Sequence, residues 1–553
     1  MVYSSLIVTA ALSSLHLVNA VNNGLARTPP MGWNNWNSLA CDVSEDLLLS
    51  TSKKLLDLGL RDMGYDHVVL DDCWQDIRGK DGYVTPDKGK FPNGMRAISD
   101  QLHTKGLKFG MYSSAGEMTC ARYAGSLDHE TKDAENFASW GVDLLKYDNC
   151  YHMGRMGTPE TSFKRFKAMA DALKATGRQI AFSLCNWGED YVHTWGMSIA
   201  NAWRMSGDIY DSFARPDDLC GCDTNNPTDP YCIAPGTHCS VLFIINKVAP
   251  FVDRSIPGGW NDLDMLEVGQ GGMTDEEYKA HFSLWAALKS PLMLGNDLRI
   301  TSPSTLSIIN NPAIIALSQD MHGRSAQRVA RNLNVPKDEY GVGETHIWSG
   351  KLHNGDQVVI LLNAANEDLD MSAPLSEIFV SEGPGGSAPQ ANLSWEVFDL
   401  WANRMSDAEA QSILEAADDQ TRAEIFGKLG WYNATDIPYE VGLEQGDKRL
   451  FGEKVGVVEA RSAWSLLLPA QLWGQATPDP IIELQLQAQN RAQARSYARA
   501  RAGPGSELWP EPGWKPGTTI PSSGSESSPA TWWLGARAGC LARAVARARS
   551  SIL

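Results

Sequence analysis

The chain has 553 residues, of which 43% are hydrophobic and 21% are charged, so it is long enough for two or three globular domains with a sizeable core. Its formal net charge of -18 argues against a nucleic-acid partner or an anionic membrane, because phosphates would be repelled over most of the surface. The eleven histidines are scattered and no Cys-His group has zinc spacing, so we expect no metal and no other cofactor. These totals fit a soluble protein with uncharged ligands, and they leave the oligomeric state open.

Residues 1–20 predict a signal peptide. An apolar stretch ends in Val18-Asn19-Ala20, which places small residues where a signal peptidase cleaves. No Lys or Arg lies near Met1, so a short hydrophobic anchor is the alternative. Secretion agrees with the cysteines, because nine of the ten lie between Cys41 and Cys239, as in proteins of an oxidising compartment. Two sequons compatible with glycosylation in that compartment begin at Asn392 and Asn433.

Between residues 21 and 325 one unit recurs about eight times: a short apolar strand, polar residues at its end, and a helical stretch. The expected strands are 31–36, 68–74, 109–114, 144–150, 181–187, 203–208, 259–264 and 292–297. Helical runs separate them, for example 44–58, 159–176 and 274–288. Eight such units predict an α/β fold, a (β/α)8 TIM barrel. A doubly wound sheet is the alternative, but no Gly-rich phosphate loop follows the first strand.

From residue 326 to 470 the pattern changes to strands without barrel-type helices, which predicts an antiparallel β-sandwich. The expected strands include 345–349, 357–363, 395–401 and 454–459, and a polar helical insertion covers 406–429. Residues 471–553 are rich first in Ala, Gln and Arg and then in Pro, Gly and Ser, so we expect a low-complexity, disordered tail. A basic interaction tail and translated non-coding sequence are alternatives for this segment.

The stretch GVDLLKYDNC, residues 141–150, is the strongest candidate for a chemical site. A short apolar run ends abruptly in charged residues, which is typical of a buried strand that delivers them at its C-terminal end. Lys146 and Asp148 are two positions apart, so both side chains lie on one face of the strand, and we expect the ammonium to keep the carboxylate ionised. The alternative is a structural ion pair without chemistry.

The other expected strands also end in polar or aromatic residues, and in a barrel these ends meet at one mouth. The motifs there are TPPMGWNNW, LDDCW, KYDNC, SLCNW, RMSGD and GGWNDLDML. Over about residues 24–470 the chain closely resembles the retaining α-galactosidases of glycoside hydrolase family 27, the melibiases, in which these motifs occur in the same order. The resemblance is to the secreted fungal type, and the family also contains α-N-acetylgalactosaminidases.

The resemblance implies a secreted, exo-acting α-galactosidase that removes terminal non-reducing α-galactose from oligosaccharides and galactomannans. It assigns Asp148 as the nucleophile and Asp208 as the acid/base. Retention needs two carboxyl groups about 5 Å apart, and we expect Asp208 to stay protonated until the bond breaks. Asp211 is the second choice for the acid, and a helix cap is the non-catalytic interpretation of Asp208. An α-N-acetylgalactosaminidase and a catalytically silent galactose-binding protein are the functional alternatives.

The resemblance also implies the sugar-binding residues. Asp71 and Asp72 would bind the outer hydroxyls of galactose, including the axial one. Lys146 and Arg204 would donate to ring hydroxyls, although Arg204 could instead form an ion pair inside the barrel. Tyr112 would donate a hydrogen bond to the nucleophile.

Aromatic and sulfur side chains complete the implied pocket. Trp33 would provide an apolar face for the sugar ring, with plain core packing as the alternative. Cys185 and Trp187 would fill the space beside the second hydroxyl and exclude an N-acetyl group, although a lone buried Cys is usually inert packing. Four residues of another family motif would support the site without taking part in the chemistry: Trp260, Asn261, Asp262 and Asp264.

In the family, Cys41 pairs with Cys73 and Cys120 with Cys150, which ties loops at the barrel mouth. Three pairings are possible among the next four cysteines. The nested arrangement, Cys220 with Cys239 and Cys222 with Cys232, matches the secreted microbial branch.

Overall fold

The computed structural model describes residues 23–214, 238–353, 355–373, 378, 395–396, 398–401, 404–428, 449–450, 457–458 and 462–468. The predicted signal peptide, both sequons and the predicted tail lie outside these residues. The chain divides into two compact units, 1–487 and 488–553, and all the described residues belong to the first. In the part of the chain that is described, no helix has both the length and the apolar character needed to cross a membrane.

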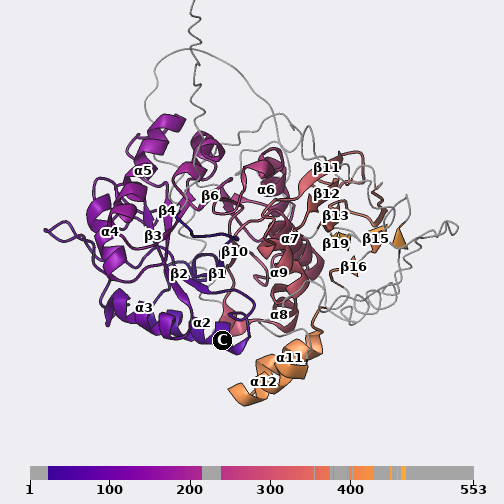
Figure 1. Cartoon of the computed structure of the whole chain (residues 1–553), viewed down its shortest axis with the longest axis horizontal. Coiled ribbons are helices and arrows are strands. Elements are labelled where there is room, and N and C mark those ends of the chain that lie inside the picture. The colour runs from indigo at the N-terminus through magenta and orange to yellow at the C-terminus, as the bar shows by residue number, and fades with distance from the viewer. Residues whose placement is uncertain are drawn as a thin grey trace, which may run out of the picture. The chain divides into compact units, whose positions relative to one another are not determined.

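Eight parallel strands form the first sheet (Figure 1), and they are the eight that the sequence predicts. In sheet order they are β10 (Leu292–Leu294), β1 (Met31–Asn34), β2 (His67–Leu70), β3 (Lys108–Ser114), β4 (Leu144–Asp148), β5 (Ala181–Cys185), β6 (Ala202–Arg204) and β9 (Trp260–Asp262). Each observed strand ends at or before the polar residues of its motif, which therefore lie at the strand ends and in the loops that follow.

A backbone bridge next to β9 closes the sheet into a barrel. No ladder joins β9 to β10, but Leu266, four residues beyond β9, pairs in parallel with Leu294. Its amide donates to the carbonyl of Met293 at 2.7 Å, and its carbonyl accepts from the amide of Gly295 at 2.9 Å. The segment after β9 therefore completes the (β/α)8 TIM barrel.

The side chains of the barrel strands alternate between its interior and the surrounding helices. Val69, Leu144 and Ala181 lie in register across neighbouring strands and form a small apolar cluster of their own. Val68 and Leu145, one position away on the same strands, belong to the main hydrophobic core. Because this period of two is strict in a strand, position alone decides which side chains reach the interior.

The three helices that the sequence predicts form and are capped as their sequences suggest. Ser44 caps α2 (Glu45–Asp57), and Thr158 caps α5 (Pro159–Ala175), which has Pro at its first position. Thr274 forms a capping box at α7 (Asp275–Ala287). The other helices of this region are α1 (Trp36–Leu39), α3 (Gly94–Thr104), α4 (Glu130–Ser139), α6 (Val241–Val248), α8 (Pro303–Ile309) and α9 (Pro312–Gln319), with 3-10 turns η1 (Glu189–Thr194), η2 (Gly196–Ser198), η3 (Ala249–Arg254) and η4 (Leu298–Ile300).

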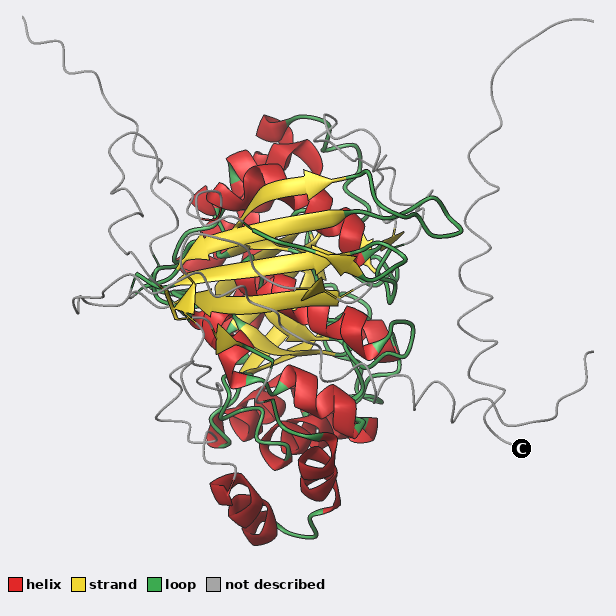
Figure 2. Ribbon diagram, turned by 90° about the vertical axis from the view of Figure 1, so that its right-hand side faces the viewer, coloured by secondary structure: helices red, strands yellow, loops and turns green. Residues whose placement is uncertain are grey.

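A second, antiparallel sheet confirms the expected change of fold, and Figure 2 shows its strands side by side. Its order is β11 (Gln327–Asn332), β12 (Thr345–Lys351), β13 (Gln357–Asn363), β19 (Ser462–Leu468) and β16 (Phe398–Asp399). Two short pairs accompany it, β14 (Leu369–Asp370) with β18 (Val457–Val458) and β15 (Trp395–Glu396) with β17 (Arg449–Leu450). The single strand expected at 395–401 is thus two short strands with different partners. The helical insertion forms α11 (Asp407–Glu415) and α12 (Asp419–Lys428).

The tight interior of the barrel predicts different outcomes for two glycine substitutions. A Cβ on Gly110 would lie 2.7 Å from Cγ2 of Val69, and a Cβ on Gly32 would lie 2.3 Å from the backbone carbonyl of His67. We expect Gly110→Ala to lower the free energy of unfolding by about 1–3 kcal/mol, as overpacking does, and a second change, Val69→Ala, to restore part of it. Gly32→Ala should not be rescued by any side-chain change, because a carbonyl is the obstacle. Thermal unfolding of the wild type and the three variants measures this, and a Gly110→Ala protein as stable as the wild type would contradict it.

Candidate active site

The end of β4 places Asp148 inside the barrel mouth. In the sheet register Asp148 lies opposite Ser114 on β3 and Cys185 on β5, and Lys146 lies opposite Tyr112. The Asp148 side chain is buried, with 6% of the residue exposed. Lys146 and Asp148 therefore lie on one side of the sheet, as the sequence predicts, and the register adds Tyr112 and Cys185 to that side.

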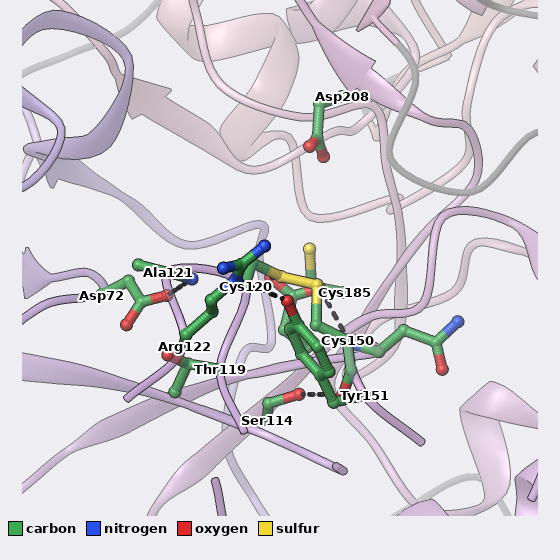
Figure 3. Close-up of a disulfide and its surroundings, with 12 residues drawn as sticks. Asp72, Ser114, Thr119, Cys120, Ala121, Arg122, Cys150, Tyr151, Cys185 and Asp208 are labelled. Atoms are coloured by element: carbon green, nitrogen blue, oxygen red, sulfur yellow. Dashed lines mark hydrogen bonds between the residues drawn. A yellow bond between two sulfur atoms is a disulfide. The ribbon is translucent and has the colours of Figure 1, made fainter. Parts of the chain in front are cut away.

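Two donors hold the Asp148 carboxylate. The Tyr112 hydroxyl donates to Oδ2 at 2.8 Å, the contact expected from the resemblance, and the Asn149 amide donates to Oδ1 at 2.8 Å. Sγ of Cys120 also lies 3.4 Å from Oδ2. This sulfur belongs to the Cys120–Cys150 disulfide and carries no proton, so it packs against the carboxylate without donating to it (Figure 3).

The ionisation of Asp148 differs from the expectation. Burial raises the pKa of Asp148 to about 7, while the Lys146 ammonium opposes that rise and the Asp208 carboxylate adds to it. Lys146 makes its close ion pair with Asp71, at 2.7 Å between Nζ and Oδ2. Lys146 favours the ionised form of Asp148, as the sequence predicts, but desolvation outweighs the effect of this cation, which is committed to another carboxylate.

Asp208 begins β7 (Asp208–Ile209) and is about one-third exposed. Its Oδ1 accepts from Nη2 of Arg204 at 2.9 Å, and the same nitrogen lies 2.9 Å from Oδ2 of Asp264. The carboxylate expected to protonate the leaving group is thus paired with a buried arginine, and it must exchange that partner for the glycosidic oxygen during the reaction. In Figure 3 its carboxylate points toward Cys185 and the disulfide.

The second choice for the acid, Asp211, already has partners for both of its oxygens. The Tyr278 hydroxyl donates to Oδ1 at 2.9 Å, and the Gly272 amide donates to Oδ2. These bonds join the segment after β7 to α7 and to the loop before it. They leave Asp211 less available than Asp208 for proton transfer.

The buried acidic pair, Asp71 and Asp72, is supported by protein donors. Oδ2 of Asp71 accepts from the Asn34 amide group and from Lys146, both at 2.7 Å. The amides of Cys73 and Ala121 donate to Asp72 at 2.7 and 2.8 Å. Burial nevertheless raises the pKa of Asp72 to about 6. Asp72 therefore also anchors the loop after β3, in addition to any contact with a sugar.

Trp33 does not present a face to the barrel mouth. It is fully buried, its indole nitrogen donates to the carbonyl of Asn296 at 2.7 Å, and it belongs to the core between strands and helices. Its neighbour Asn34 faces the interior, so alternation along β1 turns Trp33 outward. The structure favours core packing over the expected sugar platform. Trp36, the second tryptophan of the same motif, lies just beyond β1 and is only partly buried. Its position after the end of the strand is the sequence signal that could have identified it.

Cys185 and Trp187 line the β5 side of the site. Cys185 is a free, buried cysteine, and Nη1 of Arg204 lies 3.4 Å from its sulfur. Trp187 is buried in a left-handed backbone conformation, with φ of 59°. A cavity inside the barrel reaches this layer and is lined on its polar side by Lys146, Cys185, Arg204, Asp262 and Asp264, and on its apolar side by residues such as Val69, Leu144, Ala181 and Met293.

Two expected disulfides are present, Cys41–Cys73 and Cys120–Cys150. Cys239 is also disulfide-bonded, but Cys220, Cys222 and Cys232 lie outside the described residues, so the nested pairing stays a prediction. Cys120, Asp148 and Cys150 bring three metal-ligating atoms within 4.8 Å of one another. Because the two sulfurs are bonded to each other, neither is a thiolate that would bind a metal.

The fold is a parallel eight-stranded barrel, with Asp148 at the end of β4 and Asp208 just after β6. The two residues are close enough for the charge of Asp208 to raise the pKa of Asp148. This barrel and this pair of carboxyl groups define a (β/α)8-barrel glycoside hydrolase. The alpha galactosidase A family model matches residues 28–230 and 235–320, and the alpha galactosidase C-terminal beta sandwich domain matches residues 342–420. The chain belongs to the alpha galactosidase A family.

Known proteins agree along most of the chain. An alpha-galactosidase of Lachancea cidri is 51% identical over 434 residues, which are 78% of this chain and 90% of that protein. One of Zygotorulaspora mrakii is 50% identical over 463 residues, 84% of this chain and 96% of that protein. The solved structure of alpha-galactosidase from Saccharomyces cerevisiae with raffinose has a TM-score of 0.73 and 46% identity, and the match covers 81% of this chain and 99% of that one.

The raised pKa of Asp148 predicts that its charge destabilises the fold. An unfolded Asp loses its proton near pH 4 and the folded one near pH 7, so the native state binds more protons between these values and its stability falls as pH rises. We expect Asp148→Asn to have a higher Tm than the wild type at pH 7.5 and a similar Tm at pH 3.5. Calorimetry at both values measures this, with Asp253→Asn, at an exposed position, as the control. A variant less stable than the wild type at pH 7.5 would contradict it.

Proposed function

We propose that this chain is a secreted, exo-acting α-galactosidase that hydrolyses terminal non-reducing α-D-galactose residues of oligosaccharides and galactomannans with retention. The observation that carries this proposal is the pair of carboxylates, Asp148 and Asp208, which interact electrostatically at the mouth of one barrel. Relatives of about half-identical sequence that are named alpha-galactosidases support the substrate. The solved yeast relative with raffinose supports an α-galactoside oligosaccharide as a ligand.

Asp148 is proposed as the nucleophile. Its oxygen attacks the anomeric carbon, the bond from that carbon to the leaving oxygen breaks, and Asp208 gives its proton to the leaving oxygen. Asp208 then takes a proton from water, which attacks the same carbon and releases Asp148 and α-galactose. The Tyr112 and Asn149 donors aim the Asp148 oxygens throughout. Positive charge on the sugar in the transition state favours the ionised form of Asp148, which burial disfavours in the free enzyme.

The buried polar side chains would bind the galactose. Asp71, Asp72, Lys146 and Arg204 supply acceptors and donors for its hydroxyls, and each already has a protein partner that keeps it in place. We assign the apolar face of the sugar to Trp36, because Trp33 is fully buried on the other side of β1.

Cys185 and Trp187 are proposed to exclude an N-acetyl group at the second carbon of the sugar. Both are buried at the β5 side of the site, and Cys185 is fixed beside Arg204. This assignment favours galactose over N-acetylgalactosamine.

The proposed organisation is a signal peptide at 1–20, a catalytic barrel at 21–325, a β-sandwich at 326–470 and a low-complexity tail at 471–553. The ranges of the two family matches support the middle boundary, since one match ends at residue 320 and the next begins at 342. Disulfides near the site support secretion into an oxidising compartment.

Substrate and stereochemistry are tested together. We expect the purified full chain to hydrolyse 4-nitrophenyl α-galactoside at least about a hundredfold faster than the N-acetylgalactosaminide, because a buried wall rejects the larger group. Proton NMR of the reaction should show α-galactose before mutarotation. Faster hydrolysis of the N-acetylated sugar would favour the α-N-acetylgalactosaminidase, binding without hydrolysis would favour a silent galactose-binding protein, and initial β-galactose would exclude retention.

Azide rescue separates the roles of the two carboxylates. We expect Asp148→Ala to lose at least about a thousandfold in kcat, with azide restoring turnover as β-galactosyl azide, because azide then attacks from the vacant nucleophile side. Asp208→Ala should keep more activity on a nitrophenyl leaving group than on a sugar, and azide should yield α-galactosyl azide from the covalent intermediate. Product stereochemistry by NMR decides between them, and the opposite pattern would exchange the two assignments. Asp211→Ala, with no azide product, is the matched control.

A further inference from the structure

The loops that follow β3 and β4 meet beside the proposed nucleophile. Three side-chain links join them, in addition to a backbone hydrogen bond from Glu117 to Tyr151: the Cys120–Cys150 disulfide, a hydrogen bond from Nε of Arg122 to the Tyr151 hydroxyl at 3.0 Å, and a two-pronged ion pair between Arg155 and Asp128 at 2.7 Å. The first two links are adjacent, because Arg122 comes two residues after Cys120 and Tyr151 follows Cys150. The third link lies farther along both loops.

The disulfide contacts the Asp148 carboxylate, so the neighbouring Arg122–Tyr151 pair lies close to the reacting group. Cys120 Sγ is 3.4 Å from Oδ2 of Asp148. In Figure 3 the Arg122 guanidinium and the Tyr151 hydroxyl lie beside the disulfide, and Asp208 lies across from them with its carboxylate pointing toward the disulfide. Asp208 is the residue that would protonate the leaving oxygen, so the departing group lies between Asp208 and the disulfide, next to these two side chains.

The burial pattern separates this pair from the residues that would hold galactose. Asp71 and Asp72 are buried and the Lys146 side chain is only 15% exposed, whereas Arg122 is exposed and Tyr151 is half-buried. An exo-acting enzyme encloses the terminal sugar, so the part of the substrate that reaches an exposed rim beside the scissile bond is the leaving group.

Both residues are held in place and still have donors to offer. Each has a left-handed backbone, with φ of 71° at Arg122 and 51° at Tyr151, a conformation that persists only where the surroundings impose it. The disulfide and the 3.0 Å hydrogen bond are such surroundings. Within the described residues, neither terminal nitrogen of the Arg122 guanidinium has a hydrogen-bond acceptor. An arginine fork presents these donors in a fixed direction toward hydroxyl oxygens.

We propose that Arg122 and Tyr151 form the leaving-group subsite, where they hydrogen-bond to the hydroxyls of the sugar that departs from galactose. The inference rests on the proposed function and adds the residues that determine which aglycone is preferred. By microscopic reversibility, the same pair binds an acceptor sugar when the galactosyl group is transferred from Asp148 to that sugar instead of to water.

The experiment compares two substrates that share galactose and differ in what leaves. Melibiose releases a sugar, whereas α-galactosyl fluoride releases an ion that cannot reach the rim. We expect Arg122→Ala and Tyr151→Phe each to lower kcat/KM for melibiose about tenfold, the scale of one lost hydrogen bond, and to change kcat/KM for the fluoride less than twofold. The inhibition constant of free galactose, which occupies only the enclosed pocket, should stay unchanged. Arg122→Lys, which keeps the charge and one donor, should recover part of the loss.

Arg155→Ala is the matched control, because it removes an arginine that also joins the two loops but lies away from the disulfide. It should leave both substrates unchanged. A parallel loss on melibiose and fluoride, a weaker galactose inhibition constant, or unchanged melibiose kinetics in both Arg122→Ala and Tyr151→Phe would overturn the subsite. A wild-type protein inactive on α-galactosyl fluoride would instead overturn the proposed function, so the two failures are distinguishable.

Discussion

The active site depends on a cluster of carboxylates at the barrel mouth, which has only two cations among the described residues, Lys146 and Arg204, to neutralise it. Lys146 pairs with Asp71, and a single nitrogen of Arg204 serves both Asp208 and Asp264. Because water is excluded there, a carboxylate without a cation of its own is costly to ionise. Asp148 is in this position, which is why burial raises its pKa to about 7. Its ionised form is stabilised by the charge of Lys146 and by the hydrogen bonds from the Asn149 amide and the Tyr112 hydroxyl.

A second set of contacts fixes the residue that follows the nucleophile. The Asn149 side chain donates to Glu189 at 2.6 Å and accepts from Arg165 at 2.5 Å. Arg165 in turn donates to the carbonyl of Ala115, at the end of β3, at 2.8 Å. These buried bonds join the ends of three strands behind Asp148. They restrict the backbone whose amide points at the carboxylate, which is how a reacting group is kept in a productive orientation.

The disulfides add covalent constraints at the same edge of the barrel. Cys73 directly follows Asp72, and Cys150 lies two residues after Asp148. Each of the two cysteines is tied to a neighbouring loop. Burial of the sugar-binding residues and exposure of the rim then follow from where these loops end. The division into an enclosed galactose pocket and an open leaving-group side is therefore a property of the loops, which the barrel strands position.

The sequence alone determined the barrel, its eight strands, its capped helices and the change to an antiparallel sheet, because strand periodicity, caps and turn residues are local signals. It also placed Lys146 and Asp148 on one face of their strand, since alternation has a period of two, while the place of Tyr112 beside Asp148 was implied by the family resemblance. Only the tertiary structure decided that Trp33 faces the core, that Lys146 pairs with Asp71, and that Leu266 closes the barrel. These outcomes depend on which strands become neighbours and on how much water each side chain loses, and residues far apart in the chain set both.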